Sequence, residues 1–135
     1  MERTLVILKP DAVERKLIGE IITRFEKRNL EIINMKMTKI SREKAEEHYS
    51  HISGMPFFND MIDYITMGEV VIMMLEGENA INMVRNMIGK TSSIESSPGT
   101  VRGDFGYHRF MNLIHASDSV ESAEKEIIRF FGQET

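Results

Sequence analysis

Four histidines have the most obvious capacity for chemistry in this chain, and one is set apart by its position. His115 closes the last apolar run, residues 111–115, and is followed by residues 116–119 (ASDS), a sequence typical of a helix start. A side chain between a strand end and a helix N-terminus is well placed to meet an anion. Because imidazole is mostly neutral near pH 7, His115 is a candidate nucleophile toward phosphorus. The alternative is a histidine without function.

A glutamate in the final predicted helix is the second candidate. That helix, from about residue 120 to 131, carries an apolar stripe formed by Val120, Ala123, Ile127, Phe130 and Phe131. Glu126 lies at the edge of this stripe, where a carboxylate without a partner is unfavourable. It could orient Ser117 or the imidazole of His115. A solvated glutamate on the helix flank is the alternative.

Positive charge gathers in the segment that precedes His115. Arg85 belongs to a predicted helix, and the loop after it carries Lys90, Arg102 and Arg109. Together these side chains could neutralise a polyphosphate, to which Thr91 could donate a hydrogen bond. Basic loop residues are usually only solvated, which is the alternative for each of them.

Two other patterns carry less weight. Residues 89–91 (GKT) resemble the end of a phosphate-binding P-loop, but Val84 stands where that motif needs glycine, and a predicted helix precedes it. His48 and His51 could share a metal ion, although the sequence offers no obvious third ligand. We therefore expect no dedicated metal site built from protein residues.

Composition limits the class of protein. The chain has 135 residues, 41% hydrophobic and 28% charged, with no cysteine and a formal net charge of −4. These values predict one globular domain over residues 1–135, without disulfides or a thiol nucleophile. The acidic balance argues against a nucleic-acid partner, and no apolar run approaches the roughly 20 residues that span a bilayer. We expect a cytoplasmic protein that binds a small anionic ligand.

Hydrophobic periodicity predicts an alternation of strands and helices. Strands are expected at residues 3–9, 30–38, 69–75 and 111–115, and helices at 17–28, 41–49, 57–65, 80–88 and 120–131. Ser41 is the expected N-cap of the second helix. This order favours an α/β (α+β) fold, a ferredoxin-like four-stranded antiparallel sheet covered by helices. A wholly parallel, doubly wound sheet is the alternative.

The segment from Gly89 to Arg109 shows no sustained periodicity. Connections longer than about 12–15 residues are uncommon in compact domains, and those that occur are often functional. We therefore predict a long functional loop here, shaped by the turn pair Pro98-Gly99.

Four segments together resemble the nucleoside diphosphate kinase family. They are ERTLVILKPDAV (2–13), HYSHISGMPFF (48–58), SSPGTVRGDF (96–105) and NLIHASDSVESAEKEI (112–127). The last is similar to the specific active-site signature of the family, N-x-x-H-[GA]-S-D-S. The resemblance extends from residue 2 to about residue 131.

The resemblance implies a role for each matching residue. His115 would accept a phosphoryl group from a nucleoside triphosphate and pass it to a diphosphate in a ping-pong cycle, with its imidazole positioned by Glu126 and Ser117. The implied nucleotide contacts are phosphate binding by Arg85, Thr91 and Arg102, ribose and phosphate binding by Lys9, Tyr49 and Asn112, and base stacking by Phe57.

The resemblance also implies Mg²⁺ bound with the nucleotide phosphates, and a homo-oligomer, either hexamer or tetramer. Three places depart from the common pattern: Ala116 replaces a frequent glycine, His51 replaces a frequent acidic residue near the metal, and residues 106–111 diverge. A binding module without turnover and a ligand-sensing domain are the alternative functions.

Strict alternation in the last strand would place Asn112 and His115 on opposite faces of the sheet. Both can reach one ligand only if Asn112 precedes the regular strand.

Overall fold

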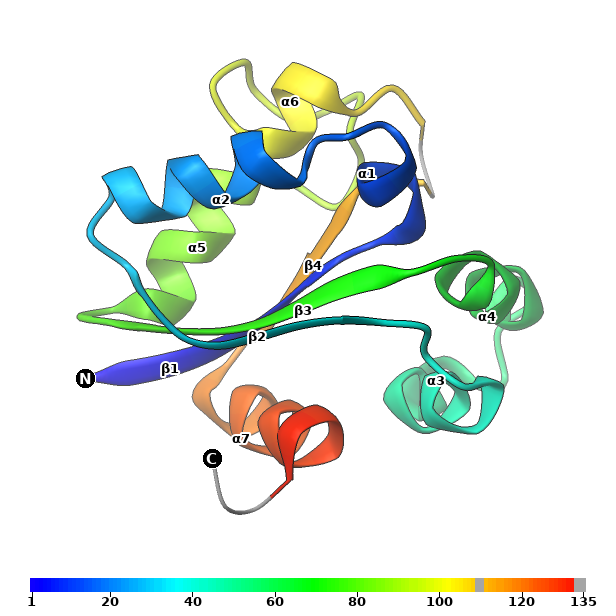
Figure 1. Ribbon diagram of the computed structural model, residues 1–135. Helices are drawn as coiled ribbons and strands as arrows, with labels where there is room; N and C mark the ends of the chain where they lie inside the picture. Colours follow the sequence, from blue (N-terminus) through cyan, green and yellow to red (C-terminus); the bar gives the residue numbers. More distant parts are fainter. Residues whose placement is uncertain (109–110, 133–135) are drawn as a thin grey trace.

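The computed structural model describes residues 1–108 and 111–132, which build a four-stranded antiparallel sheet (Figure 1). The strands are β1 (Glu2–Leu8), β2 (Glu31–Thr38), β3 (Val70–Gly77) and β4 (Ile114–Ala116), in the order β2-β3-β1-β4. Every neighbouring pair runs antiparallel. The ferredoxin-like prediction is confirmed, and the parallel alternative is wrong.

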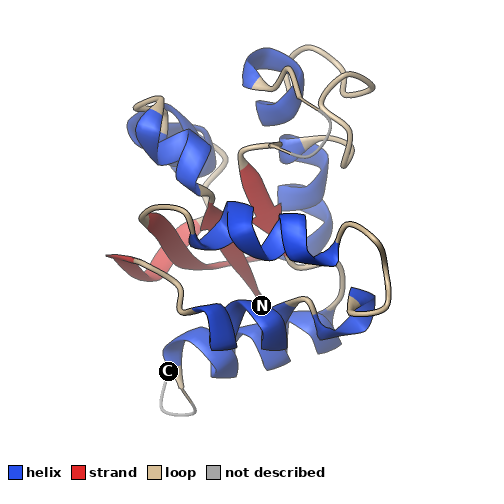
Figure 2. Ribbon diagram, turned by 90° about the vertical axis from the view of Figure 1, so that its right-hand side faces the viewer, coloured by secondary structure: helices blue, strands red, loops and turns tan. Residues whose placement is uncertain are grey.

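Helices cover both faces of the sheet (Figures 1 and 2). On one face lie α1 (Pro10–Glu14), α2 (Ile18–Lys27), α5 (Ala80–Ile88) and α6 (Val101–Phe105). On the other lie α3 (Arg42–His48), the 3₁₀ turn η1 (Ser50–Ile52), α4 (Phe58–Thr66) and α7 (Val120–Phe131). Ser41 caps α3 as predicted, since its side chain accepts from the Lys44 N–H. Within the described residues no helix is long and apolar enough to cross a bilayer.

The central strands β1 and β3 are covered on both faces of the sheet, and each contributes side chains to two separate hydrophobic cores. Val6 and Leu8 pack with the helices α2 and α5, whereas Leu5 and Ile7 pack toward α4 and α7. This follows from the alternation of side chains along a strand. Because residues 4–8 of β1 are fully buried, Lys9, which directly follows them, starts from a fixed position.

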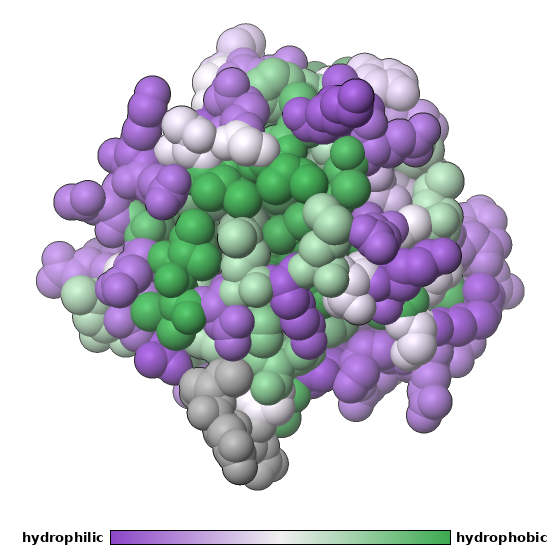
Figure 3. Space-filling view, in the orientation of Figure 1, coloured by the Kyte–Doolittle hydropathy of each residue, from purple (hydrophilic) through white to green (hydrophobic). Residues whose placement is uncertain are grey.

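Strand β2 forms one edge of the sheet and is largely exposed. Met35 and Met37, two positions apart and so on one face, are 48% and 52% exposed. Figure 3 shows an apolar area over the part of this face where α2 and β2 lie in Figure 1. An edge strand with exposed apolar side chains is a surface suited to self-association.

The segment predicted as a structureless loop contains the helix α6, so that prediction is wrong for residues 101–105. Five residues are too few to show helical periodicity. Thr100 caps α6 by accepting from the Gly103 N–H at 3.0 Å. Gly103 admits no side chain, because a Cβ atom there would lie 1.9 Å from the Ser97 carbonyl oxygen. The helix therefore packs directly onto the loop that carries Pro98. Of the predicted loop cations, Arg109 lies outside the described residues.

A second short helix was also missed. Pro10, expected only to end the first strand, stands at the start of α1, where its lost N–H costs nothing.

The last strand begins later than predicted, at Ile114 instead of residue 111. Leu113 has a positive φ of 74°, which breaks the extended backbone before β4. Asn112 therefore precedes the regular strand, as the geometric expectation required, and alternation does not separate it from His115.

Candidate active site

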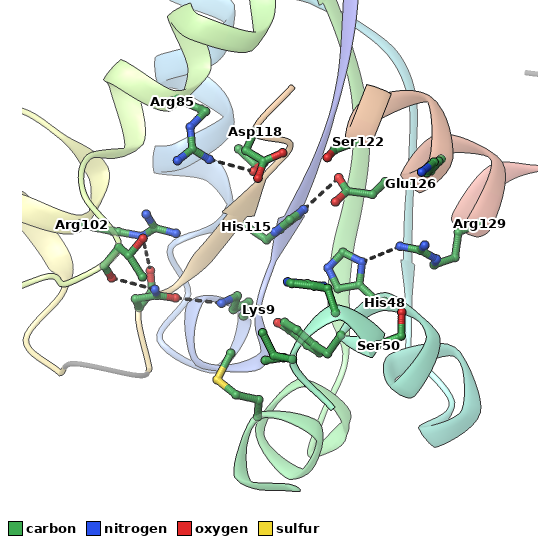
Figure 4. Close-up of a pocket in the computed structure, with 18 residues that line it drawn as sticks. Lys9, His48, Ser50, Arg85, Arg102, His115, Asp118, Ser122, Glu126 and Arg129 are labelled. Atoms are coloured by element: carbon green, nitrogen blue, oxygen red, sulfur yellow. Dashed lines mark hydrogen bonds and ion pairs between the residues drawn. The ribbon is translucent and has the colours of Figure 1, made fainter. Parts of the chain in front are cut away.

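A pocket of about 590 Å³ lies where the ends of β1 and β4 meet α3, η1, α5 and α7 (Figure 4). Eight of the ten predicted site residues line it: Lys9, Tyr49, Arg85, Thr91, Arg102, Asn112, His115 and Glu126. They come from segments as far apart in sequence as residues 9 and 126, so the fold brings them together.

The two other predicted residues lie outside the pocket lining. Ser117 is fully buried, and it reaches the site through Glu126. Phe57 directly precedes α4 and is partly buried.

His115 is held by a carboxylate. Glu126 Oε1 lies 3.0 Å from His115 Nε2 and accepts a 2.7 Å hydrogen bond from the Ser117 hydroxyl. Ser117 in turn accepts from the backbone N–H of Leu5 at 3.1 Å. The chain of contacts connects the imidazole to the centre of strand β1, which is the most buried part of the sheet.

This geometry decides which ring nitrogen can act. A carboxylate accepts a hydrogen, so neutral His115 carries its proton on Nε2 and keeps a lone pair on Nδ1. Burial raises the pKa of the Glu126 carboxyl, but the bonds from His115 and Ser117 outweigh it and leave that pKa below its usual value. Glu126 is therefore ionised when His115 is neutral.

His48 also lines the pocket, next to His115. Its ring lies edge-to-face against His115, with centroids 4.7 Å apart and planes at 82°. Arg129 Nη1 donates to His48 Nδ1 at 3.0 Å. Burial and the charges of His115, Arg129, Lys9 and His51 lower the pKa of His48 to about 2, so its ring is neutral.

In the described part of the chain, His48, His115 and Glu126 each offer one ligand atom within 4.8 Å of the others, a spacing that could hold a metal ion. Their hydrogen bonds account for the same spacing, because Arg129 already donates to His48 and Ser117 to Glu126. We assign no metal to this cluster.

Lys9 brings a buried amine to the pocket. Its Nζ donates to Asn112 Oδ1 at 2.8 Å, and the residue is only 4% exposed. Burial, and then the positive charge of Arg102, lower the pKa of Lys9 to about 7, whereas Asp11 opposes the shift. An incoming anion would favour the charged form of this amine.

Arg102 does more than the predicted phosphate contact. It donates to three backbone carbonyls, those of Asn112 at 3.2 Å, Gly89 at 3.1 Å and Ile114 at 2.5 Å. Burial and the nearby Arg85 lower its pKa to about 10, so it stays charged. Arg102 thus ties both ends of the long loop together, and the N–H groups left over can serve a ligand.

The other side chains predicted to meet phosphate, namely Arg85, Thr91 and Lys90, are arranged differently. Arg85 is exposed, and its Nη1 donates to the Ala116 carbonyl at 3.4 Å, beside the catalytic candidate. Thr91 is anchored through its own carbonyl, which accepts from the Asn112 side chain at 2.9 Å. Lys90 is exposed and does not line the pocket.

Several pocket residues were not selected from the sequence. His48, His51, Asp118, Ser122, Lys125 and Arg129 all line the cavity. Asp118 stands within the signature around His115, and Arg129 follows Glu126 by three positions on one helix, so spacing could have indicated both. His48 was considered only as a metal ligand.

The model of the family described as "Nucleoside diphosphate kinase" matches residues 2–135. This chain belongs to the nucleoside diphosphate kinase family. Among its relatives, the nucleoside diphosphate kinase of Acetivibrio thermocellus is 69% identical over 131 residues, which cover 97% of this chain and 96% of that protein. The enzyme of Methanocaldococcus jannaschii is 55% identical, covering 98% and 95%.

Solved structures of the family share the fold. The apo enzyme from Encephalitozoon cuniculi has a TM-score of 0.97 at 45% identity and covers 99% of this chain and 91% of its own. The enzyme from Halobacterium salinarum, solved in complex with CDP, has a TM-score of 0.96 at 42% identity, covering 98% and 89%. The predicted family and fold are confirmed.

Proposed function

We propose that this chain transfers the terminal phosphoryl group of a nucleoside triphosphate to a nucleoside diphosphate, with His115 as the covalent carrier. The observation that carries the proposal is the contact between Glu126 Oε1 and His115 Nε2, which leaves the Nδ1 lone pair for phosphorus. Family membership and the cationic pocket around the imidazole support it.

The reaction proceeds in two displacements. Nδ1 of His115 attacks the γ-phosphorus, the bond to the bridging oxygen breaks, and the diphosphate leaves with that electron pair. A terminal oxygen of the second diphosphate then attacks the same phosphorus, and the N–P bond breaks with its electron pair returning to Nδ1. While the group is attached, the ring keeps its Nε2 proton and becomes a cation, which the Glu126 carboxylate stabilises.

The nucleotide is held by the residues that the family resemblance selects. Arg85, Arg102 and Thr91 bind the phosphates, and charge neutralisation by the two arginines is the main demand of phosphoryl transfer. Lys9, Tyr49 and Asn112 bind ribose and phosphate, and their places in the pocket support this. Phe57 stacks on the base; because every base has a π-face, we expect low base selectivity.

Mg²⁺ bound with the nucleotide phosphates would neutralise part of their charge during transfer. The pocket carboxylates fit a minor role toward the ion. Glu126 is engaged with His115 and Ser117, and position 51 is histidine, so Asp118 is the described pocket carboxylate best placed to help. Its exposed position suits contact with a hydrated ion.

We also propose that the chain forms one domain over residues 1–135 and assembles as a homo-oligomer, either hexamer or tetramer. The apolar edge strand β2, with Met35 and Met37 exposed, supports self-association. The cytoplasmic location stays a prediction.

Labelling of the intermediate tests the function. The protein is incubated with ATP labelled at the γ-phosphate, denatured, and examined for acid-labile, base-stable label on His115. Label there, released on addition of a second nucleoside diphosphate, is the expected result. A protein that binds nucleotides but takes up no label would be a binding or sensing module instead.

A further inference from the structure

Arg129 reaches the active site from the helix that also carries Glu126. The two residues are three positions apart on α7, and both side chains line the pocket (Figure 4). The Arg129 guanidinium donates to His48 Nδ1 at 3.0 Å, and its Nε lies 3.4 Å from Glu47 Oε2. With its side chain 16% exposed, Arg129 is held at both contacts instead of extending into solvent.

The contact with Arg129 decides the tautomer of His48. An arginine can only donate, so Nδ1 of His48 must be the acceptor, and the proton of the neutral ring must sit on Nε2. If Nδ1 carried a proton, that proton would face the guanidinium N–H at 3.0 Å. The ring therefore has one orientation and one protonation state in which the contact survives.

The fixed orientation of His48 restricts the His115 ring, because the two rings are packed against each other. Its ring meets His115 edge-to-face and also lies edge-on to Phe130, with centroids 5.4 Å apart. Since His48 is only 6% exposed, its ring cannot turn without disturbing these neighbours. The His115 imidazole is thus supported by a hydrogen bond to Glu126 and by packing against His48.

We propose that Arg129 is a positioning residue for phosphoryl transfer: by fixing the tautomer and orientation of His48, it holds the His115 ring at the angle needed for attack by Nδ1. This inference rests on the proposed role of His115 as nucleophile. Arg129 acts through His48 and need not touch the nucleotide. Its loss should therefore slow the chemical step and leave nucleotide binding nearly unchanged.

The competing explanation is that Arg129 simply adds positive charge to the pocket. Three variants separate the two. Arg129→Leu removes charge and donor, whereas Arg129→Gln removes the charge but keeps an amide N–H that can donate to His48. Lys125→Leu removes another pocket cation on the same helix, four positions earlier, and serves as the matched control.

We expect Arg129→Leu to lower the rate of His115 phosphorylation by about tenfold or more, the usual effect of losing a residue that orients an active group. The dissociation constant for ADP should change less than about twofold, while Arg129→Gln recovers most of the rate and Lys125→Leu lowers the rate much less than Arg129→Leu does. Equal losses in all three variants would assign Arg129 a charge role and overturn the proposal. Thermal unfolding of each variant shows whether the fold is intact.

The tautomer can be observed directly. In ¹⁵N NMR spectra of the wild-type protein, the Nδ1 signal of His48 should be that of an unprotonated nitrogen and Nε2 that of a protonated one. Arg129→Leu should give a mixture of tautomers, and Arg129→Gln should keep the wild-type pattern. An unchanged pattern in Arg129→Leu would overturn the proposal even if the rate fell. Since this readout needs no turnover, it is independent of the labelling of His115, which tests the function itself.

Discussion

Glu126 and Arg129 lie three positions apart on α7 and hold two different imidazoles, those of His115 and His48, whose rings meet edge-to-face 4.7 Å apart. One helix face therefore sets the orientation of both rings. Helix α7 packs mainly against β1 and so positions the proposed active site together with the strand that carries His115.

Replacing His115 with Ala should abolish exchange between ATP and other nucleoside diphosphates. The chain has no cysteine, and the neighbouring His48 is buried with its Nδ1 bound by Arg129, so neither a thiol nor that imidazole can take the place of His115. Nucleotide binding should survive, because its contacts come from other residues. Turnover above about 1% of wild type in a coupled assay would contradict the covalent mechanism.

Ser117→Ala should lower both the unfolding free energy and the rate of His115 phosphorylation. The hydroxyl accepts from the Leu5 N–H and donates to Glu126, in a position that is fully buried. Removing it should cost about 1–3 kcal/mol of unfolding free energy, because buried polar groups lose their partner. Urea denaturation and the phosphorylation rate measure the two effects.

Ser119→Ala is the matched control for this prediction. Ser119 is the N-cap of α7 and accepts from the Ser122 N–H at 3.0 Å, so its loss should cost about 1 kcal/mol. Its side chain contacts Asp118 and not Glu126, so the rate should fall less than in Ser117→Ala. If both variants slowed the reaction equally, Ser117 would act only by stabilising α7.

Much of this fold can be predicted from the sequence, and the exceptions have physical causes. Strands β1 and β3 and helices α5 and α7 are long enough for their apolar periodicity to be visible. Helix α6 has only five residues, and its position depends on the contact of Gly103 with Ser97, which no local pattern encodes. The late start of β4 depends on a positive φ at Leu113, a residue type for which that conformation is unfavourable.

The residues of the candidate site also fall into those that the sequence indicates and those that only the fold reveals. His115 and Glu126 could be selected because one ends a strand and the other interrupts an apolar stripe. The contact of Arg129 with His48 joins residues 81 positions apart, and the three carbonyls held by Arg102 are invisible in a sequence. Side chains that act through tertiary contacts need the fold to be known first.

Arg102→Ala should slow His115 phosphorylation more than it weakens diphosphate binding. Its charge is proposed to stabilise the phosphoryl group in transfer, an effect of a few kcal/mol when one preorganised charge partner is lost. Because Arg102 also joins Gly89, Asn112 and Ile114, the variant should unfold at lower urea concentration. Stopped-flow kinetics and ADP titration give the two constants; equal losses in both would make Arg102 a binding residue only.

Phe57→Ala should weaken binding of all nucleotides by similar amounts, around 1–3 kcal/mol if stacking values from single-stranded nucleic acids transfer. Titration with ADP, GDP, CDP and UDP measures the effect. Phe58→Ala is a useful comparison. Phe58 is the first residue of α4 and packs against the core that α4 shares with the sheet, so its loss should mainly lower stability. A loss confined to purines would mean that the pocket recognises base edges.

Binding of a nucleoside diphosphate should become weaker as pH rises above about 7, because the pKa of Lys9 is about 7 and phosphate favours its charged form. The affinity should fall by up to about tenfold for each pH unit between 7 and 9. At pH 8 the protein should take up a proton on binding, which calorimetry in two buffers of different ionisation enthalpy detects. Lys9→Gln should remove both effects, whereas Lys90→Gln, which changes an exposed lysine outside the pocket, should keep them.

The same pKa shift affects the stability of the protein in the absence of nucleotide. The folded pKa of Lys9 lies below the unfolded value of 10.5, so the unfolded chain binds more protons between pH 7 and 10.5. The contribution of Lys9 to the unfolding free energy therefore rises across this range, and below pH 7 the buried charge is a constant cost. Subtracting the urea stability of Lys9→Gln from that of wild type at each pH isolates this term. A difference that stays flat from pH 7 to 9 would show that the amine is charged throughout, and the loss of affinity would then need another cause.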